Sequence, residues 1–349
     1  MGGAPALQSL PESLIAEAEL PDPFPRNPIG LGMGAPTLLA YGTERQLDRH
    51  LRPLFTGEEV WCQLFSEPGA GSDVAGLATR ARATDDGWLV NGQKVWTSFA
   101  HIARFGMLLA RTDPGVPKHK GLTYFIVDMH ALGVRPRPLV QMTGDAEFNE
   151  VFFTNVHVPA DAVLGKVGEG WAVATATLMH ERVALGGLTP PRGSGPIAAA
   201  VDAWRDRDPD GDQPLDDLMR LWVDSEALRL VNIRAAQLRE AGVPGPQGSI
   251  GKLLGAELNQ RTYGFAAELL GLEALLFPGG YDAEHRPNGR RTLDSTQRAS
   301  LRSLANTIEG GTAEVMRNIL AERVLKLPPE PRMDNRVPWS EVASGKVVC

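Results

Sequence analysis

The first well-patterned segment of the chain has helical spacing. In residues 36–58 the side chains on one helical face are Leu47, His50, Leu51 and Leu54. Gly57 is expected to end this helix, and Pro53 is expected to kink or shorten it. The residues before 36 are rich in Pro and Gly and show little periodicity, so no long element is predicted there.

Short β-prone runs replace the helical pattern from residue 61 onwards. In GWLVNGQKVWTS (87–98), two such runs flank Asn91-Gly92, which is a strong hairpin signal. The runs FGMLLART, LTYFIVDM and NEVFFTNVHVP continue the pattern to about residue 159, between turns of Gly, Pro and Asp. We therefore predict an antiparallel β domain over residues 61–165.

Helical periodicity returns after Gly168. Residues 170–187 are rich in Ala, Thr and Leu and contain no Pro, and residues 215–240 place apolar side chains on one stripe. The stripe consists of Leu218, Leu221, Leu228, Ala235 and Leu238. We predict a helix over each of these two segments.

Two further helices have candidate capping residues. Ser249 and Thr312 each precede a run with helical spacing, so each is expected to cap a helix N-terminus. Between these helices, residues 276–292 form a polar stretch of Gly, Pro and Arg that predicts a loop. The tail from Pro328 is too rich in proline to continue a helix.

Together these patterns predict an α+β multidomain protein. A short helical segment comes first, an antiparallel β domain follows, and a long helical domain comes last. The expected boundaries are residues 1–60, 61–165 and 166–328, with a tail over 329–349.

Composition narrows the classes of function. The 349 residues are 43% apolar and 22% charged, with a formal net charge of -7, which is ordinary for a globular protein. There is no Lys/Arg cluster of a nucleic-acid binder, no apolar stretch of bilayer length and no signal-peptide pattern at the N-terminus. Cys62 and Cys349 are the only cysteines, which fits a reducing compartment. We expect a cytoplasmic protein that binds neither nucleic acid nor membrane, and no metal because the histidines lack ligand spacing.

Three segments carry residues suited to ligand binding. FSEPGAGSDVAGL (65–77) has glycines that let a ligand approach the backbone, beside the Ser72 hydroxyl. NGQKVWTSFAH (91–101) can present Trp96 and two hydroxyls to a planar cofactor. TIEGGTAEVMRN (307–318) has paired glycines before a helix start, where free N–H groups can bind an oxyanion. Each has a plain structural alternative: a surface turn, a core tryptophan and a simple helix entry.

The order of five segments resembles the acyl-CoA dehydrogenase family of flavoproteins. Within residues 36–328 the segments are SEPGAGSD, NGQKVWTS, VFFTNVHVP, LMHERVALGG and IEGGTAEVMRNILAERVLKLP. The resemblance implies FAD as cofactor, an acyl-CoA thioester as substrate and an electron-transfer flavoprotein as acceptor. It also implies the acyl-CoA dehydrogenase fold: an N-terminal helical domain, here only a remnant, a middle β domain and a C-terminal four-helix bundle.

The same resemblance implies a carboxylate base that removes the α proton of the thioester. Most family members carry this base directly before the Gly-Thr that opens the last long helix, where this chain has Gly310. Other members carry it in the first helix after the β domain, where this chain has Glu181. We therefore assign Glu181 as base in preference to Glu309, and the Gly310 N–H as a donor to the thioester carbonyl. Without the resemblance, Glu181 would be interpreted as a salt-bridged structural residue.

Further residues are assigned to ligands by the resemblance. Those expected to contact FAD are Phe65, Ser66, Gly71, Ser72, Trp96, Thr97 and Ser98. Those expected to contact the substrate are Ser72, Arg182, Glu309 and Gly310. Adjacent helix residues do not share a face, so Arg182 is expected to shape the site from beside the base.

Two segments of the family pattern are replaced in this chain. An Arg-x-x-Phe-Gly segment is replaced within residues 202–217, and a Gln-x-x-Gly-Gly-x-Gly run within residues 267–276. In the family these segments hold the ADP part of a neighbouring subunit's FAD. The chain is therefore expected to form an oligomer, and its damaged half-site indicates a second, distinct acyl-CoA dehydrogenase subunit. A homo-oligomer, a structural subunit without its own chemistry, and an oxidase or acyl-carrier-protein enzyme stay open as alternatives.

Overall fold

A computed structural model describes residues 24–186, 191–207, 215–242, 245–276, 295–332 and 334–343. The chain divides into two compact units. Unit 1 comprises Met1–Leu139, Phe148–Glu181 and Pro331–Cys349, and unit 2 comprises Val140–Glu147 and Arg182–Glu330. The expected loop over 276–292 lies almost wholly outside the described residues.

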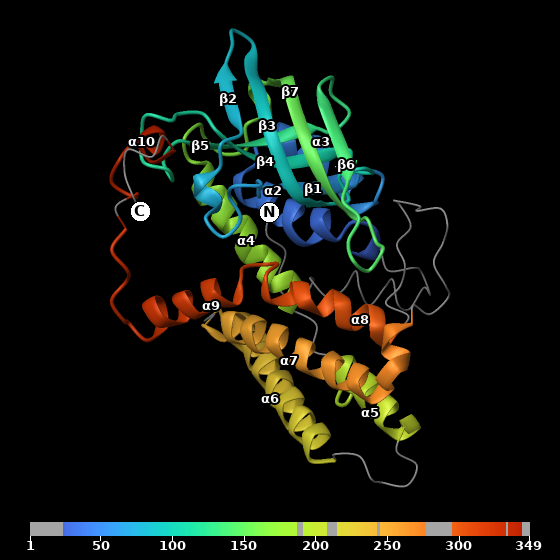
Figure 1. Cartoon of the computed structure of the whole chain (residues 1–349). Coiled ribbons are helices and arrows are strands. Elements are labelled where there is room, and N and C mark those ends of the chain that lie inside the picture. The colour runs from blue at the N-terminus through green and yellow to red at the C-terminus, as the bar shows by residue number, and fades with distance from the viewer. Residues whose placement is uncertain are drawn as a thin grey trace. The chain divides into compact units, whose positions relative to one another are not determined.

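Unit 1 is built on a seven-stranded sheet (Figure 1). Its strands are β1 (Trp61–Leu64), β2 (Arg80–Ala83), β3 (Gly87–Ser98), β4 (Phe105–Arg111), β5 (Leu122–Asp128), β6 (Val134–Pro138) and β7 (Phe148–Pro159). The strand order is β1-β4-β2-β3-β7-β6, and β5 pairs with β4. The β3–β7, β4–β5, β2–β3 and β6–β7 pairs are antiparallel, as predicted. The β1–β4 and β2–β4 contacts are parallel, which differs from the purely antiparallel sheet that we predicted.

The predicted hairpin at Asn91-Gly92 is wrong, because both residues lie inside the single strand β3. The pairing of β3 with β7 shifts between Val90 and Gly92, which marks a β-bulge. Gly92 has a φ of +153°, and a Cβ there would lie 2.4 Å from the Thr79 Oγ1 atom. The extra residue of the bulge lies on β7, which takes three steps from Val156 to Phe153 against two on β3. The glycine is therefore required for the close approach of Thr79, and not for a turn.

Three helices cover one face of this sheet: α2 (Ala35–Tyr41), α3 (Glu44–Phe55) and α4 (Gly170–Gly186). The single helix predicted over 36–58 is two helices, because Thr43 starts α3 with a capping box to Gln46. Pro53 lies within the last turn of α3 and does not break it.

Strand β4 is buried on both faces and divides the core of unit 1 into two clusters. Met107 and Leu109 pack towards the helices, whereas Leu108 packs into the other cluster with Cys62 and Phe153. This alternation follows the two-residue period of a strand. Cys62 is fully enclosed, and its burial raises the pKa of the thiol.

Unit 2 is helical. It contains α5 (Pro196–Arg207), α6 (Leu215–Glu240), α7 (Gln247–Leu270), α8 (Thr296–Ser303) and α9 (Ala313–Ile319). Helix α7 packs against α5, α6, α8 and α9 (Figure 1). Of the predicted α6 stripe, Leu218, Leu221 and Ala235 are buried.

One of the two predicted helix caps is confirmed. The Thr312 side chain accepts a hydrogen bond from the Val315 N–H at 3.1 Å and starts α9. Ser249 is not a cap, because α7 begins two residues earlier, directly after Pro246. The N-cap residue is Pro246, and no side chain caps the helix. In residues 329–332 and 334–338 the tail has no helix or strand, and a short helix follows, α10 (Trp339–Ala343).

Candidate active site

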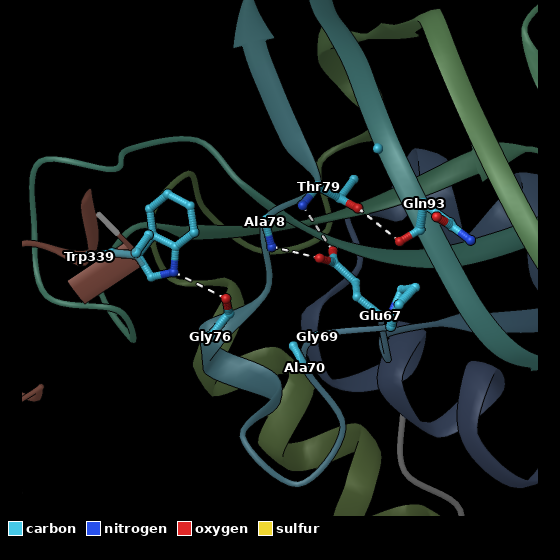
Figure 2. A pocket seen from close by; sticks show the side chains of 11 residues that line it. Glu67, Gly69, Ala70, Gly76, Ala78, Thr79, Gln93 and Trp339 are labelled. Atoms are coloured by element: carbon cyan, nitrogen blue, oxygen red, sulfur yellow. Dashed lines mark hydrogen bonds between the residues drawn. The ribbon is translucent and has the colours of Figure 1, made fainter. Parts of the chain in front are cut away.

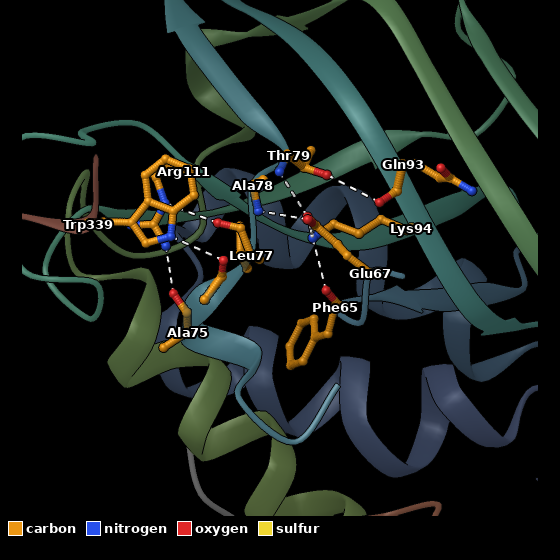
Figure 3. Close-up of polar contacts among 11 residues, drawn as sticks. Phe65, Glu67, Ala75, Leu77, Ala78, Thr79, Gln93, Lys94, Arg111 and Trp339 are labelled. Atoms are coloured by element: carbon orange, nitrogen blue, oxygen red, sulfur yellow. Dashed lines mark hydrogen bonds and ion pairs between the residues drawn. The ribbon is translucent and has the colours of Figure 1, made fainter. Parts of the chain in front are cut away.

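A buried ion pair anchors the start of the glycine-rich segment. The Lys94 Nζ atom lies 2.8 Å from the Glu67 Oε1 atom and donates to the Phe65 carbonyl at 2.9 Å (Figure 3). Lys94 is fully buried, and burial lowers its pKa to about 8 against the opposing charge of Glu67. The ammonium is therefore still protonated at neutral pH. The ion pair fixes the backbone at Phe65, directly before the predicted flavin contact Ser66.

Glu67 also closes the loop that follows. Its carboxylate accepts from the Ala78 N–H at 2.7 Å and from the Thr79 N–H at 2.9 Å (Figure 2). Burial alone would raise the pKa of Glu67, but Lys94 and these hydrogen bonds produce a net lowering. The carboxylate stays charged, and charge-assisted hydrogen bonds of this kind are strong. Both ends of the loop are thereby held together.

The tip of this loop is open. Gly69, Gly71 and Ser72 are exposed, and a Cβ at either glycine would meet no atom of the described residues within 4 Å. A cavity of about 460 Å³ lies beside the loop (Figure 2). It is lined in part by Glu67, Gly69, Ala70, Gly76, Thr79 and Gln93. A ligand can therefore approach the backbone of the tip directly.

Strand β3 is irregular at its end, where the predicted FAD contacts Trp96, Thr97 and Ser98 lie. Its register with β7 shifts between Lys94 and Thr97, and Trp96 has a φ of 60°. The Trp96 side chain is 61% exposed, which excludes the core-tryptophan alternative. Thr97 is buried, and its hydroxyl has no hydrogen-bond partner in the part of the chain that the structure describes. A strained backbone beside an orphaned buried hydroxyl is typical of a ligand site.

The two predicted flavin segments lie next to each other in unit 1. The Val95 N–H donates to the Ser66 carbonyl at 2.9 Å, and Asn149 Nδ2 donates to the Thr97 carbonyl at 3.1 Å. Ser98 is the half-buried last residue of β3. The structure thus brings residues 65–66 and 96–98 together, with the open loop tip following in the chain.

Helix α4 holds Glu181 one turn beyond a buried polar anchor. The Thr177 hydroxyl lies 3.1 Å from both the Tyr124 hydroxyl and the Thr37 hydroxyl. Residues four apart share a helix face, so Glu181 follows Thr177 on the side that packs on the sheet. Glu181 is half-buried, and burial lowers the pKa of the neighbouring His180. Arg182 continues the helix backbone, and its side chain lies outside the described residues.

The predicted oxyanion turn lies in unit 2. Gly310 and Gly311 have φ values of +62° and +92°, so both need the left-handed freedom of glycine. Glu309 is bound by Arg302 through both carboxylate oxygens, at 2.8 and 3.0 Å. Asn306 Nδ2 adds a hydrogen bond at 2.8 Å. The Glu309 carboxylate is therefore committed to holding the turn.

Lys252 holds the same turn from helix α7. Its Nζ atom donates to the Asn306 carbonyl at 2.8 Å and to the Gly311 carbonyl at 2.6 Å. No hydrogen bond joins the Gly310 N–H to the backbone of the described residues. The turn is thereby fixed on both sides.

Sequence reasoning missed Lys94, Lys252 and Arg302. A signal for Lys94 was present, because it shares the inward parity of Val90 on β3. A lysine at an inward strand position requires a buried carboxylate partner. The partners of Lys252 and Arg302 depend on packing between helices and on the path of an irregular turn, and the sequence contains no comparable signal for them.

Among the residues with a described placement, no group of His, Cys, Asp and Glu is arranged to hold a metal ion. In the same residues, no helix is long and apolar enough to cross a membrane.

Comparison with known proteins defines the class. Residues 62–156 match the middle domain of acyl-CoA dehydrogenases, and residues 168–325 match their C-terminal domain. The chain belongs to the acyl-CoA dehydrogenase family, whose members are FAD-dependent oxidoreductases. The predicted family, fold and cofactor are thereby confirmed. The exposed Trp96 ring, the orphaned Thr97 hydroxyl and the open loop tip fit a planar flavin and its pyrophosphate.

Two similar proteins are acyl-CoA dehydrogenases of Mycobacterium tuberculosis. The chain is 42% identical over 329 residues to acyl-CoA dehydrogenase FadE34 of Mycobacterium tuberculosis, covering 94% of this chain and 43% of that protein. It is 40% identical over 319 residues to acyl-CoA dehydrogenase IpdE1 of the same organism, covering 91% and 79%. The chain thus spans less than half of the first relative's length.

Solved structures include two similar assemblies. The Tcur3481-Tcur3483 steroid ACAD has a TM-score of 0.77 at 30% identity, covering 90% of this chain and 79% of that chain. The ChsE4-ChsE5 complex from Mycobacterium tuberculosis has a TM-score of 0.73 at 31% identity, covering 90% and 80%.

Proposed function

We propose that this chain catalyses the FAD-dependent α,β-dehydrogenation of an acyl-CoA thioester to the trans-2-enoyl-CoA. When bound, FAD supplies the acceptor for the hydride that leaves the β carbon. The proposed contacts to FAD come from Phe65, Ser66, Gly71, Ser72, Trp96, Thr97 and Ser98. The electrons pass on to an electron-transfer flavoprotein. Membership of the family and the fit of these residues to a flavin support this proposal.

Glu181 is the proposed base. The observation that supports this choice concerns the other candidate base, Glu309. Both of its carboxylate oxygens are bound by Arg302. A carboxylate whose lone pairs are occupied by a guanidinium is a poor proton acceptor. Glu181 itself is half-buried, and burial lowers the pKa of the neighbouring His180.

The proposed role of Gly310 is to donate its N–H to the thioester carbonyl. Removal of the α proton places negative charge on that oxygen, and a fixed backbone N–H stabilises this charge without reorganisation. Glu309 and Lys252 would act on this step by fixing the turn. Ser72 and Arg182 complete the proposed substrate contacts.

The chain is also proposed to work as one subunit of a heteromer with another acyl-CoA dehydrogenase chain. Two observations favour this: the segments that would hold the ADP part of a neighbour's FAD are replaced within residues 202–217 and 267–276, and ChsE4-ChsE5 is solved as a complex. By similarity to the steroid ACAD, a steroid side-chain thioester is the first substrate class to test. The alternative is a subunit that shares FAD without chemistry of its own.

Paired substitutions test the base. Glu181→Gln keeps the shape of the side chain and removes its basicity, so turnover with an acyl-CoA panel and a dye acceptor should fall by at least ~10²-fold. Flavin content, measured from the visible spectrum, should not change. Glu309→Gln, which can still accept from Arg302, should cost only a few-fold. The opposite ranking would refute the assignment, and wild-type protein that binds FAD without turnover would favour the structural alternative.

A further inference from the structure

The C-terminal tail of unit 1 binds the segment that directly follows Gly71 and Ser72, two of the predicted FAD contacts. The Trp339 Nε1–H donates to the Gly76 carbonyl at 3.1 Å (Figure 2). The Trp339 and Ser340 N–H groups donate to the Val116 and Pro114 carbonyls at 2.9 and 3.0 Å. Residues 334–343 lie outside both ranges matched by the family's domains.

A buried lysine joins the tail to the loop. The Lys118 ammonium, with a side chain only 9% exposed, contacts Asp73 at 2.8 Å and also Asp334 of the tail. Burial by itself would lower the pKa of Lys118, but its two carboxylate partners raise it overall. The pKa of Asp334 is lowered, chiefly by the hydrogen bond from Lys118. Lys118 and Asp334 are therefore both charged at neutral pH. Asp73 directly follows Ser72.

Arg111 completes the attachment from strand β4. Its guanidinium is fully buried and donates to the Ala75 carbonyl at 2.6 Å and the Leu77 carbonyl at 3.0 Å (Figure 3). The Trp339 ring lies over this guanidinium, 4.4 Å from its carbon to the ring centroid. Burial lowers the pKa of Arg111 to about 10, so it stays charged, and a desolvated cation–π contact is strong.

These contacts use three successive carbonyls. Those of Ala75 and Leu77 bind Arg111, and that of Gly76 between them binds Trp339. The other end of the loop is held by Glu67 and Lys94, and Gly69, Gly71 and Ser72 are exposed at the tip between the two ends. Trp339 also lines the cavity beside that tip (Figure 2).

We propose that residues 334–343 form a strap that positions the loop tip for the pyrophosphate of FAD, with Asp334 and Trp339 as positioning residues. The strap holds residues 73–77 still, so the Gly71 and Ser72 groups meet the ligand without being ordered first. Preorganisation of this kind increases affinity by lowering the entropic cost of binding. This inference rests on the proposed use of FAD by this chain.

The test compares four full-length variants in the apo and FAD-bound forms, together with any partner subunit that co-purifies. Trp339→Ala removes the ring and the hydrogen bond, Trp339→Phe keeps a ring over Arg111, and Asp334→Asn removes one charge. Ser340→Ala is the matched control, because the Ser340 side chain is exposed. FAD affinity is measured by flavin fluorescence, and loop order by hydrogen exchange of the peptide covering residues 73–77 in the apo protein.

Trp339→Ala and Asp334→Asn should each weaken FAD binding by about tenfold and speed loop exchange by a similar factor, the scale of one charge-assisted contact. Turnover at saturating FAD should stay near wild type. Trp339→Phe should recover most of the affinity, and Ser340→Ala should match wild type. Unchanged FAD affinity and exchange in both tail variants would overturn the strap. If the wild-type chain binds no FAD, alone or with its partner, the proposed function itself is refuted. If loop exchange becomes faster while FAD affinity is unchanged, the tail has a structural role only and the strap is refuted.

Discussion

His50 is a buried titratable residue in unit 1. Its ring packs edge-on against Trp61 and Phe105, with centroids 5.3 and 4.8 Å away. Only 8% of the residue is exposed, and its Nδ1 atom has no partner in the described part of the chain. Burial lowers its pKa to about 4 from an ordinary 6.5. The folded chain therefore keeps this ring neutral where the unfolded chain protonates it.

This difference predicts an acid-dependent loss of stability. Above pH 6.5 the ring is neutral in both states and contributes no pH dependence. Between pH 6.5 and 4 only the unfolded chain takes up the proton, so the free energy of unfolding falls as pH falls. From pH 7 to 5 the loss from this residue should be about 2 kcal/mol. Urea unfolding of His50→Leu should lack this part of the loss, and equal losses in both proteins would contradict the argument.

At the residue scale, local chemistry was predictable and distant pairing was not. Thr312 caps α9 as expected because capping depends on the next three residues alone. The binding of Glu309 by Arg302 and the pairing of Glu67 with Lys94 join residues through the fold. The Asn91-Gly92 signal failed for a related reason, since the same dipeptide can lie in a turn or inside a strand opposite a bulge, and only the neighbouring strand decides which.

Strand β3 depends on the close approach of Thr79 to Gly92. A methyl group there would meet the Thr79 Oγ1 atom at 2.4 Å and the Thr79 Cα atom at 2.7 Å. Gly92→Ala should therefore destabilise the fold by about 1–3 kcal/mol, as overpacking does. Gly69→Ala, which meets no atom of the described residues within 4 Å, is the control and should leave the thermal midpoint unchanged. A stable Gly92→Ala protein would show that Thr79 can move aside.

At the scale of the whole molecule, the sequence predicted the order of a helical segment, a β domain and a helical domain. The helical stripe indicates the buried face of α6, and the continuous apolar run of β4 indicates a strand buried on both faces. The division into compact units was not legible, because Val140–Glu147 joins the helical unit and Pro331–Cys349 joins the sheet unit. Long-range packing of short segments leaves no periodic signal.

Assembly is the prediction at this scale. The chain should co-purify from its native host with a distinct acyl-CoA dehydrogenase subunit, since its own half-site for a neighbour's ADP is replaced within residues 202–217 and 267–276. Native mass spectrometry should give a mass well above the 37.6 kDa of one chain, with fewer FAD molecules than chains. A homo-oligomer with one FAD in every chain would exclude the heteromer.

The enclosure of Cys62 has a kinetic consequence. Its thiol lies fully inside the sheet on β1, so a thiol reagent reaches it only when that strand opens. The sequence has one other cysteine, Cys349, and a Cys349→Ser chain would carry a single sulfhydryl. The labelling rate of Cys62 would then report how often the sheet opens under native conditions. Any compound that binds the closed sheet would lower this labelling rate in proportion to its occupancy. Binding could therefore be measured without a chromophore or a turnover assay.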